Sequence, residues 1–111
     1  MKRIAMTFQQ RMVVANVVGQ ERATIANLAI LQKLYEKIDP SADERAAVEC
    51  RAEGAMVVWD QRKASALPAK QIDIEDQQAA RLLDLLCRWQ FTIHELSWLT
   101  PLCEQLKEIT A

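Results

Sequence analysis

The most regular hydrophobic pattern in the chain lies in Asp76–Trp89, with the sequence DQQAARLLDLLCRW. On a helical period of 3.6 residues, its polar side chains fall on one narrow stripe, made of Gln77, Arg81, Asp84 and Arg88. The rest of the circumference is apolar, so other elements must cover it. We therefore expect this segment to be the central helix of the core. Asp84 and Arg88 are spaced for an ion pair on the solvent side.

A capping signal and an apolar pattern predict a helix near the start of the chain. Thr7 and Gln10 form a capping box for a helix that begins at Phe8. Gly19 is placed to end it. The valines of this segment would also suit a strand. We prefer a helix because the apolar residues occupy more than one face without alternating.

Two further helices are predicted before residue 51. Thr24 caps the first of them, which ends at Asp39–Pro40 because a residue before proline is pushed out of the helical region. Its expected inner face consists of Leu28, Leu31, Leu34 and Ile38. Ser41 and Glu44 form a second capping box, which opens a short helix through about Cys50. The exposed residues of that helix, Asp43, Glu44 and Glu49, make it acidic.

The hydrophobic period changes at Gly54. Ala55–Asp60 (AMVVWD) is typical of a strand, and Lys70–Ile74 (KQIDI) alternates polar and apolar residues with its two isoleucines on one face. The nine residues between them, QRKASALPA, are too many for a tight turn. We therefore expect one small antiparallel β-hairpin with an open loop, between the third and fourth helices.

The closing helix is predicted over Ile93–Ile109, after a third capping box formed by Thr92 and Glu95. Its expected inner face consists of Leu96, Leu99, Leu102, Cys103 and Leu106. Pro101 must kink this helix or split it. Residues 1–6 are expected to be a short lead-in or a brief extended piece. The predicted fold is a single domain, 1–111, mainly α (α+β), with five or six helices and the one hairpin.

The composition is that of an ordinary globular domain. The chain has 111 residues, of which 50% are hydrophobic and 26% charged, enough for a single core without disulfides. A net charge of −1 gives no general attraction to nucleic acid or to an anionic membrane. No uninterrupted apolar stretch is long enough to span a membrane. Cys50, Cys87 and Cys103 lack CxxC spacing, which predicts buried free thiols and a cytoplasmic protein.

No pattern predicts catalysis, a metal site or a cofactor. His94 is the only histidine, and its spacing from Cys87 and Cys103 matches no common zinc arrangement. We expect it to be partly exposed in the first turn of its helix. Ser97 shares a helix face with His94, but no nucleophile turn surrounds it. The chain has only two glycines, far apart, so it has no phosphate-binding loop. We therefore predict a non-enzymatic protein.

The three tryptophans, Trp59, Trp89 and Trp98, leave two alternatives open. Either all three close the core around the junction of hairpin and helices, or Trp98, Leu99 and Leu102 form an exposed docking face for another protein. The first alternative predicts that replacing Trp98 by alanine destabilises the fold, and the second that it weakens partner binding. Homodimerisation through the last helix is a further open alternative.

The predicted order helix–helix–helix–hairpin resembles a winged helix-turn-helix domain over residues 7–74. The resemblance implies a DNA-binding regulator, with Arg62, Lys63 and Lys70 on a basic wing at residues 61–70. The third helix would enter the major groove, but its acidic residues would repel phosphates. DNA binding is therefore the alternative function rather than the first.

Several short segments over nearly the whole chain form a second pattern. They are TFQQR, TIANLAILQKLYEKI, an acidic short helix, EGAMVVWD, KQIDI and TIHELSWL. The pattern resembles small uncharacterised proteins encoded by bacteriophages and prophages. It implies an accessory protein in the cytoplasm of the bacterial host cell, which acts by binding a host or virion protein. The predicted function is accordingly that of a protein–protein interaction module.

Overall fold

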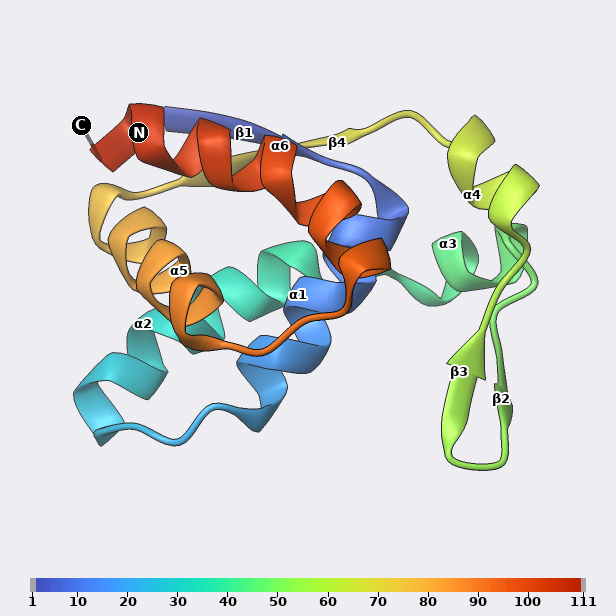
Figure 1. The fold of residues 1–111 in the computed structure, drawn as a ribbon, viewed down its shortest axis with the longest axis horizontal. Coiled ribbons are helices and arrows are strands. Elements are labelled where there is room, and N and C mark those ends of the chain that lie inside the picture. Colours follow the sequence, from blue (N-terminus) through green and yellow to red (C-terminus); the bar gives the residue numbers. More distant parts are fainter. Residues whose placement is uncertain (1, 111) are drawn as a thin grey trace.

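The computed structural model describes residues 2–110, which form six helices and two small antiparallel sheets (Figure 1). The elements are, in chain order, β1 (Lys2–Met6), α1 (Phe8–Gln20), α2 (Ile25–Ile38), α3 (Ala42–Ala47), β2 (Arg51–Glu53), β3 (Met56–Val58), α4 (Gln61–Ala66), β4 (Lys70–Ile74), α5 (Asp76–Arg88) and α6 (Ile93–Thr110). The predicted fold class, mainly α with some β structure, is confirmed.

Helices α1, α2, α3 and α6 begin at the predicted caps. The hydroxyl oxygen of Thr7 accepts from the backbone N–H of Gln10 at 3.2 Å, and the Gln10 side chain accepts from the N–H of Thr7 at 2.8 Å. The same reciprocal bonds start α3 and α6. All four valines of α1 are buried, so this segment is a helix covered on several sides and not a strand. Asp39–Pro40 ends α2 as predicted.

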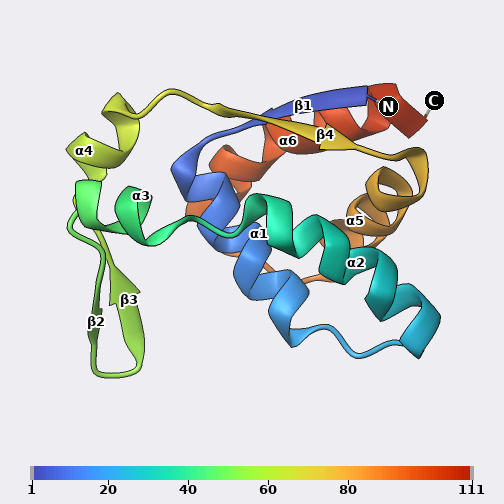
Figure 2. The ribbon, with the colours of Figure 1, turned by 180° about the vertical axis from the view of Figure 1, so that it is seen from behind.

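Helix α5 packs against α2 and α6, but it lies at one end of the molecule and seven of its thirteen residues are exposed, so the predicted central position is wrong (Figure 2). Its buried residues include Ala79, Leu82, Leu85 and Leu86. The predicted polar stripe is exposed along its whole length. Arg88 and Asp84 form the expected ion pair on this stripe, with Nε and Oδ2 3.0 Å apart. Strands β1 and β4 and helices α1, α2 and α6 complete this main core.

The predicted pairing of Lys70–Ile74 with the strand after Gly54 is wrong. β4 pairs antiparallel with β1, with Ile4 opposite Ile72 at the centre. Residues 2–6, expected to be a short lead-in or a brief extended piece, form a strand. They alternate exposed and buried positions as β4 does, and each strand turns two apolar side chains into the main core. The physical reason is burial, because only this pairing buries the apolar faces of both strands together.

The hairpin that forms is β2–β3, and it is shorter than expected. Ala52 lies opposite Val57, and Gly54 begins the two-residue turn with a φ of +63°, which favours glycine. The predicted nine-residue loop contains α4, whose first backbone N–H groups donate to the side chain of Asp60. A second, smaller cluster has Phe8 of α1, Val48 after α3 and Ala64 of α4 as its buried residues, with Trp59 after β3 packed against them.

Helix α6 runs without a break through Pro101, so of the two alternatives for this helix, a kink or a split, the split does not occur. The hydroxyl of Thr100 donates to the carbonyl of Leu96 at 2.8 Å inside this helix. Leu96 and Leu28 are exposed, not inward as predicted, because the first turns of α6 and α2 extend beyond the elements that cover the core.

The predicted burial of the three cysteines is also wrong. Cys87 is exposed, and Cys50 and Cys103 are half-buried. Burial raises the pKa of the Cys103 thiol. Within residues 2–110 no helix is long and apolar enough to cross a membrane.

Candidate partner-binding groove

A groove with a volume of about 560 Å³ separates the β2–β3 hairpin from the helical body. The hairpin side is formed by Ala55, Met56, Val57 and Trp59, and the opposite side by residues of α1, α2 and α6 together with Arg45 of α3. β2 contributes nothing to the lining, in agreement with Figures 1 and 2, where β3 is the strand nearer to the body. The groove is therefore bounded by β3 and the helices.

The hairpin exposes apolar side chains beside this groove. The exposed fraction is 68% for Met56 and 50% for Val57. Most exposed apolar residues of a protein need no explanation, but these two adjoin a concave surface whose far wall is also partly apolar, with Met12 and Tyr35. A two-stranded hairpin is by itself only marginally stable in water. A partner that covers this strand would therefore stabilise the hairpin as well as bury apolar area.

The polar lining of the groove carries a net negative charge. Asp39 and Arg45 form an ion pair with a distance of 2.7 Å between Oδ1 and a guanidinium nitrogen, so their charges offset each other. The remaining charged group is the carboxylate of Glu95, which accepts from the backbone N–H of Thr92 at 3.0 Å. A cationic group entering the groove would therefore be attracted rather than repelled.

An ion pair between the buried Arg11 and the partly exposed Glu44 holds α3, and with it the hairpin, against the body. The Arg11 side chain is only 3% exposed and donates to both carboxylate oxygens of Glu44 on α3. Its Nε also donates to the carbonyl of Ile38 at 3.0 Å. The hydrogen bond from Arg11 lowers the pKa of Glu44 to about 2. Arg11 therefore ties α1, α2 and α3 together. Sequence reasoning missed this role, and the available signal was a charged residue beside Phe8 and Met12 on the apolar face of the predicted helix.

Two of the tryptophans lie where the small cluster meets the body. The ring of Trp59 packs edge-on against Phe8, with ring centres 5.6 Å apart, and lies 6.4 Å from the ring of Trp98. Trp89 packs against the main core instead. For Trp59 and Trp98 this is the first of the two alternatives, in which the tryptophans close the core. Both rings close the junction between the two clusters.

The predicted docking face of Trp98, Leu99 and Leu102 is wrong in its geometry. Leu99 and Leu102 are buried, with exposed fractions of 3% and 0%, because they belong to the face of α6 that packs in the main core. Trp98 is half-buried beside them. Met56 and Val57, in contrast, are exposed apolar residues beside the groove. The sequence did not single them out because their strand was assigned to a different pairing.

The basic wing predicted at residues 61–70 is also wrong. Arg62 and Lys63 lie in the first turn of α4, and Lys70 begins β4 opposite Met6, so the structure places them on two elements. The side-chain nitrogen of Lys63 is 3.0 Å from a carboxylate oxygen of Glu49. In the β2–β3 hairpin, Arg51 forms an ion pair with Glu53, with a guanidinium nitrogen 2.8 Å from a carboxylate oxygen.

The geometry around the only histidine offers no activated nucleophile. The hydroxyl of Ser97 donates to the backbone carbonyl of His94 at 2.7 Å. His94 is exposed in the first turn of α6, as expected from the sequence. Within residues 2–110, no three His, Cys, Asp or Glu side chains are grouped to hold a metal ion.

No protein-family model matches the sequence, and no curated protein or solved structure is significantly similar to it. The resemblance to phage and prophage proteins therefore stays a prediction.

Proposed function

We propose that this chain is a non-enzymatic protein–protein interaction module whose partner binds in the groove between β3 and the helical body. The observation that carries the proposal is the exposure of Met56 and Val57 on a strand that borders this groove. The volume of about 560 Å³ is that of a small-molecule pocket, so the groove has room for side chains of a partner. Exposed apolar side chains beside a concavity are the usual anchor points for a partner.

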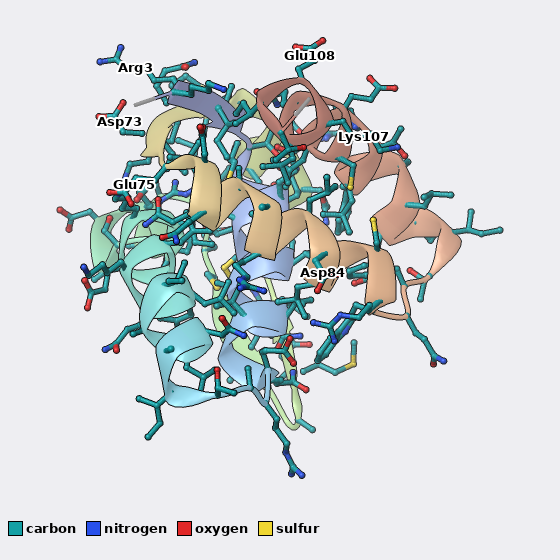
Figure 3. All side chains as sticks on the ribbon, turned by 90° about the vertical axis from the view of Figure 1, so that its left-hand side faces the viewer. Arg3, Asp73, Glu75, Asp84, Lys107 and Glu108 are labelled. Atoms are coloured by element: carbon teal, nitrogen blue, oxygen red, sulfur yellow. The ribbon has the colours of Figure 1, made fainter. Side chains whose placement is uncertain are left out.

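The opposite end of the molecule has a different surface. Figure 3 shows it, with charged side chains of both signs spread over several elements: Arg3, Asp73, Glu75, Asp84, Lys107 and Glu108. Arg3 and Asp73 form an exposed ion pair there, 2.9 Å apart. Mixed charges of this kind are typical of a solvated surface. This end therefore supplies the control position for a test of the hairpin end.

We further propose that the module is a phage or prophage accessory protein, which binds a host or virion protein in the bacterial cytoplasm. This part of the proposal rests on the sequence pattern alone. A DNA-binding regulator remains the second candidate, but its support is weaker because Arg62, Lys63 and Lys70 do not share one hairpin.

Site-specific photocrosslinking in bacterial cells tests the proposal. The residue Met56 would be replaced by the photoreactive amino acid p-benzoylphenylalanine, and Glu108 by the same amino acid as the matched control, since it is exposed at the other end of the molecule. The expected result is a discrete adduct with another protein from position 56 and none from position 108.

Two outcomes would contradict the proposal. Equal adducts from both positions would show that contacts at the hairpin are non-specific. The absence of an adduct from position 56, in uninfected and in phage-infected cells, would remove the groove as a binding surface.

A further inference from the structure

The two sheets differ in whether side chains hydrogen-bond to the backbone at their outer strand edges. The side chain of Gln105 covers the β1 edge, since it accepts from the N–H of Ala5 at 2.9 Å and donates to its carbonyl at 3.0 Å. The β4 edge is covered at Asp73, whose carbonyl accepts from the Lys37 ammonium at 3.0 Å. No side chain in the described part of the chain makes such a bond to the backbone of β3. An uncovered edge is a template for pairing with another strand.

The free backbone groups of β3 belong to Val57. Pairs in an antiparallel ladder alternate between hydrogen-bonded and non-hydrogen-bonded. The pair that closes a two-residue turn, here Glu53 with Met56, is hydrogen-bonded, so the next pair, Ala52 with Val57, is not. The N–H and C=O of Val57 therefore point away from β2, and β3 is the strand that borders the groove.

We propose that an extended segment of the partner adds to the edge of β3 as a third strand and places a basic side chain in the groove. This inference rests on the proposed function and specifies its mode of binding. Main-chain hydrogen bonds at Val57 would supply affinity, and side chains that alternate along the added strand would supply selectivity. The exposed Val57 and Met56 provide apolar contacts on the hairpin side.

The charge of the groove selects the chemistry of that segment. Two carboxylates, those of Asp39 and Glu95, line it with a single guanidinium, that of Arg45. Arg45 is occupied by Asp39 and by the carbonyl of Pro40, which accepts from its Nε at 3.1 Å. The carboxylate of Glu95 is thus the charge without a cationic partner in the lining, and it complements lysine or arginine.

A library of random peptides displayed on a filamentous phage is the probe for this inference, with the full chain as the target. Selected peptides should alternate β-branched or aromatic residues with other residues and should contain lysine or arginine. For a fluorescein-labelled selected peptide, Val57→Pro should lower the affinity about tenfold or more, because proline removes the outward N–H. Ala52→Pro is the matched control, because it removes the outward N–H from the β2 edge of the same pair, and it should change the affinity less than about twofold.

Two measurements do not depend on how well the proline variants fold. Glu95→Gln preserves the capping geometry but removes the charge. It should lower the affinity for the selected peptide about threefold and reduce the dependence of this affinity on salt concentration. In the wild-type protein, bound peptide should slow hydrogen exchange of the Val57 amide while leaving the Ala52 amide unchanged.

Each contrary result has a separate meaning. A specific crosslink from position 56 together with no effect of the peptide on the Val57 amide would refute strand addition and leave the interaction module standing. Selection of acidic peptides would refute the charge assignment. Selection of no peptide, or light scattering that shows a dimer abolished by Val57→Pro, would overturn a foreign strand as the occupant, and the dimer would identify a second copy in its place.

Discussion

Arg11 is the residue on which the relative placement of α1, α2 and α3 depends. Its guanidinium is almost completely out of water, and a buried cation is tolerated only when its donors are satisfied. The carbonyl of Ile38 and the carboxylate of Glu44 satisfy it. Glu44 also accepts from the N–H of Ser41 in the capping box of α3 at 3.1 Å, so one carboxylate both starts α3 and neutralises Arg11.

Replacing Glu44 by glutamine should therefore destabilise the protein in a pH-dependent way. The pKa of Glu44 lies near 2 in the fold, against 4.5 for the unperturbed group, so its ionised form is favoured by folding. The stabilisation is fully present above pH 4.5 and is lost as the pH falls toward 2. We expect the variant to lose about 2–3 kcal/mol of unfolding free energy at pH 7, measured by urea denaturation. The difference from the wild type should shrink as the pH falls through this window.

Glu49→Gln is the matched control for this prediction. Glu49 pairs with Lys63 on the surface, where both side chains are about half exposed. Its removal should change the unfolding free energy by less than about 0.5–1 kcal/mol. A difference between wild type and Glu44→Gln that does not change with pH would show that Glu44 acts only as a cap and not as the counter-ion of Arg11.

At the scale of single elements, α6 has an unfavourable residue in its interior. Pro101 has no N–H for the carbonyl four residues before it, and its ring crowds that carbonyl. The helix nevertheless continues to Thr110, because its buried face, with Leu99, Leu102 and Leu106, packs in the main core. Tertiary packing therefore outweighs the local signal to break.

Replacing Pro101 by alanine should consequently stabilise the protein. The side chain at this position is exposed, so no core contact is lost, and one helical hydrogen bond becomes available. We expect a gain of about 1–2 kcal/mol in unfolding free energy, reduced from the full helical penalty because proline also restricts the unfolded chain. Urea denaturation would measure it. Glu104→Ala, at another exposed position of α6, should change the unfolding free energy by less than about 0.5 kcal/mol, and an unchanged or lowered stability of Pro101→Ala would contradict the continuous helix.

At the scale of the whole molecule, charge argues against a general affinity for nucleic acid. The net charge is −1, and three cations near the hairpin are paired: Arg45 with Asp39, Arg51 with Glu53, and Lys63 with Glu49. We expect no binding of labelled random-sequence duplex DNA at low salt, measured by fluorescence anisotropy. Micromolar binding that weakens steeply with added salt would contradict this expectation and favour a DNA-binding regulator. Random DNA suffices for the test, because the electrostatic attraction to DNA phosphates does not depend on the base sequence.

The sequence by itself determined the local structure. Capping boxes and helical periods lie within a few residues of each other, so Thr7, Ser41 and the polar stripe of α5 predicted where helices start and which side faces water. The starts of α1, α2, α3, α5 and α6 were predicted correctly for this reason. The predicted ends were less accurate, since no comparable local signal ends α3 at Ala47.

Only the tertiary structure decided which segments meet. β4 could pair with a strand nearby or with β1, about seventy residues away, and its alternating pattern fits both. Burial of two apolar faces in one core favours the distant partner, and this releases β3 into a hairpin of its own. The groove exists as a consequence, because it lies between that hairpin and helices drawn from other parts of the chain. Which strands pair depends on the total apolar area that each possible pairing buries in the whole fold. A local sequence pattern does not contain this information.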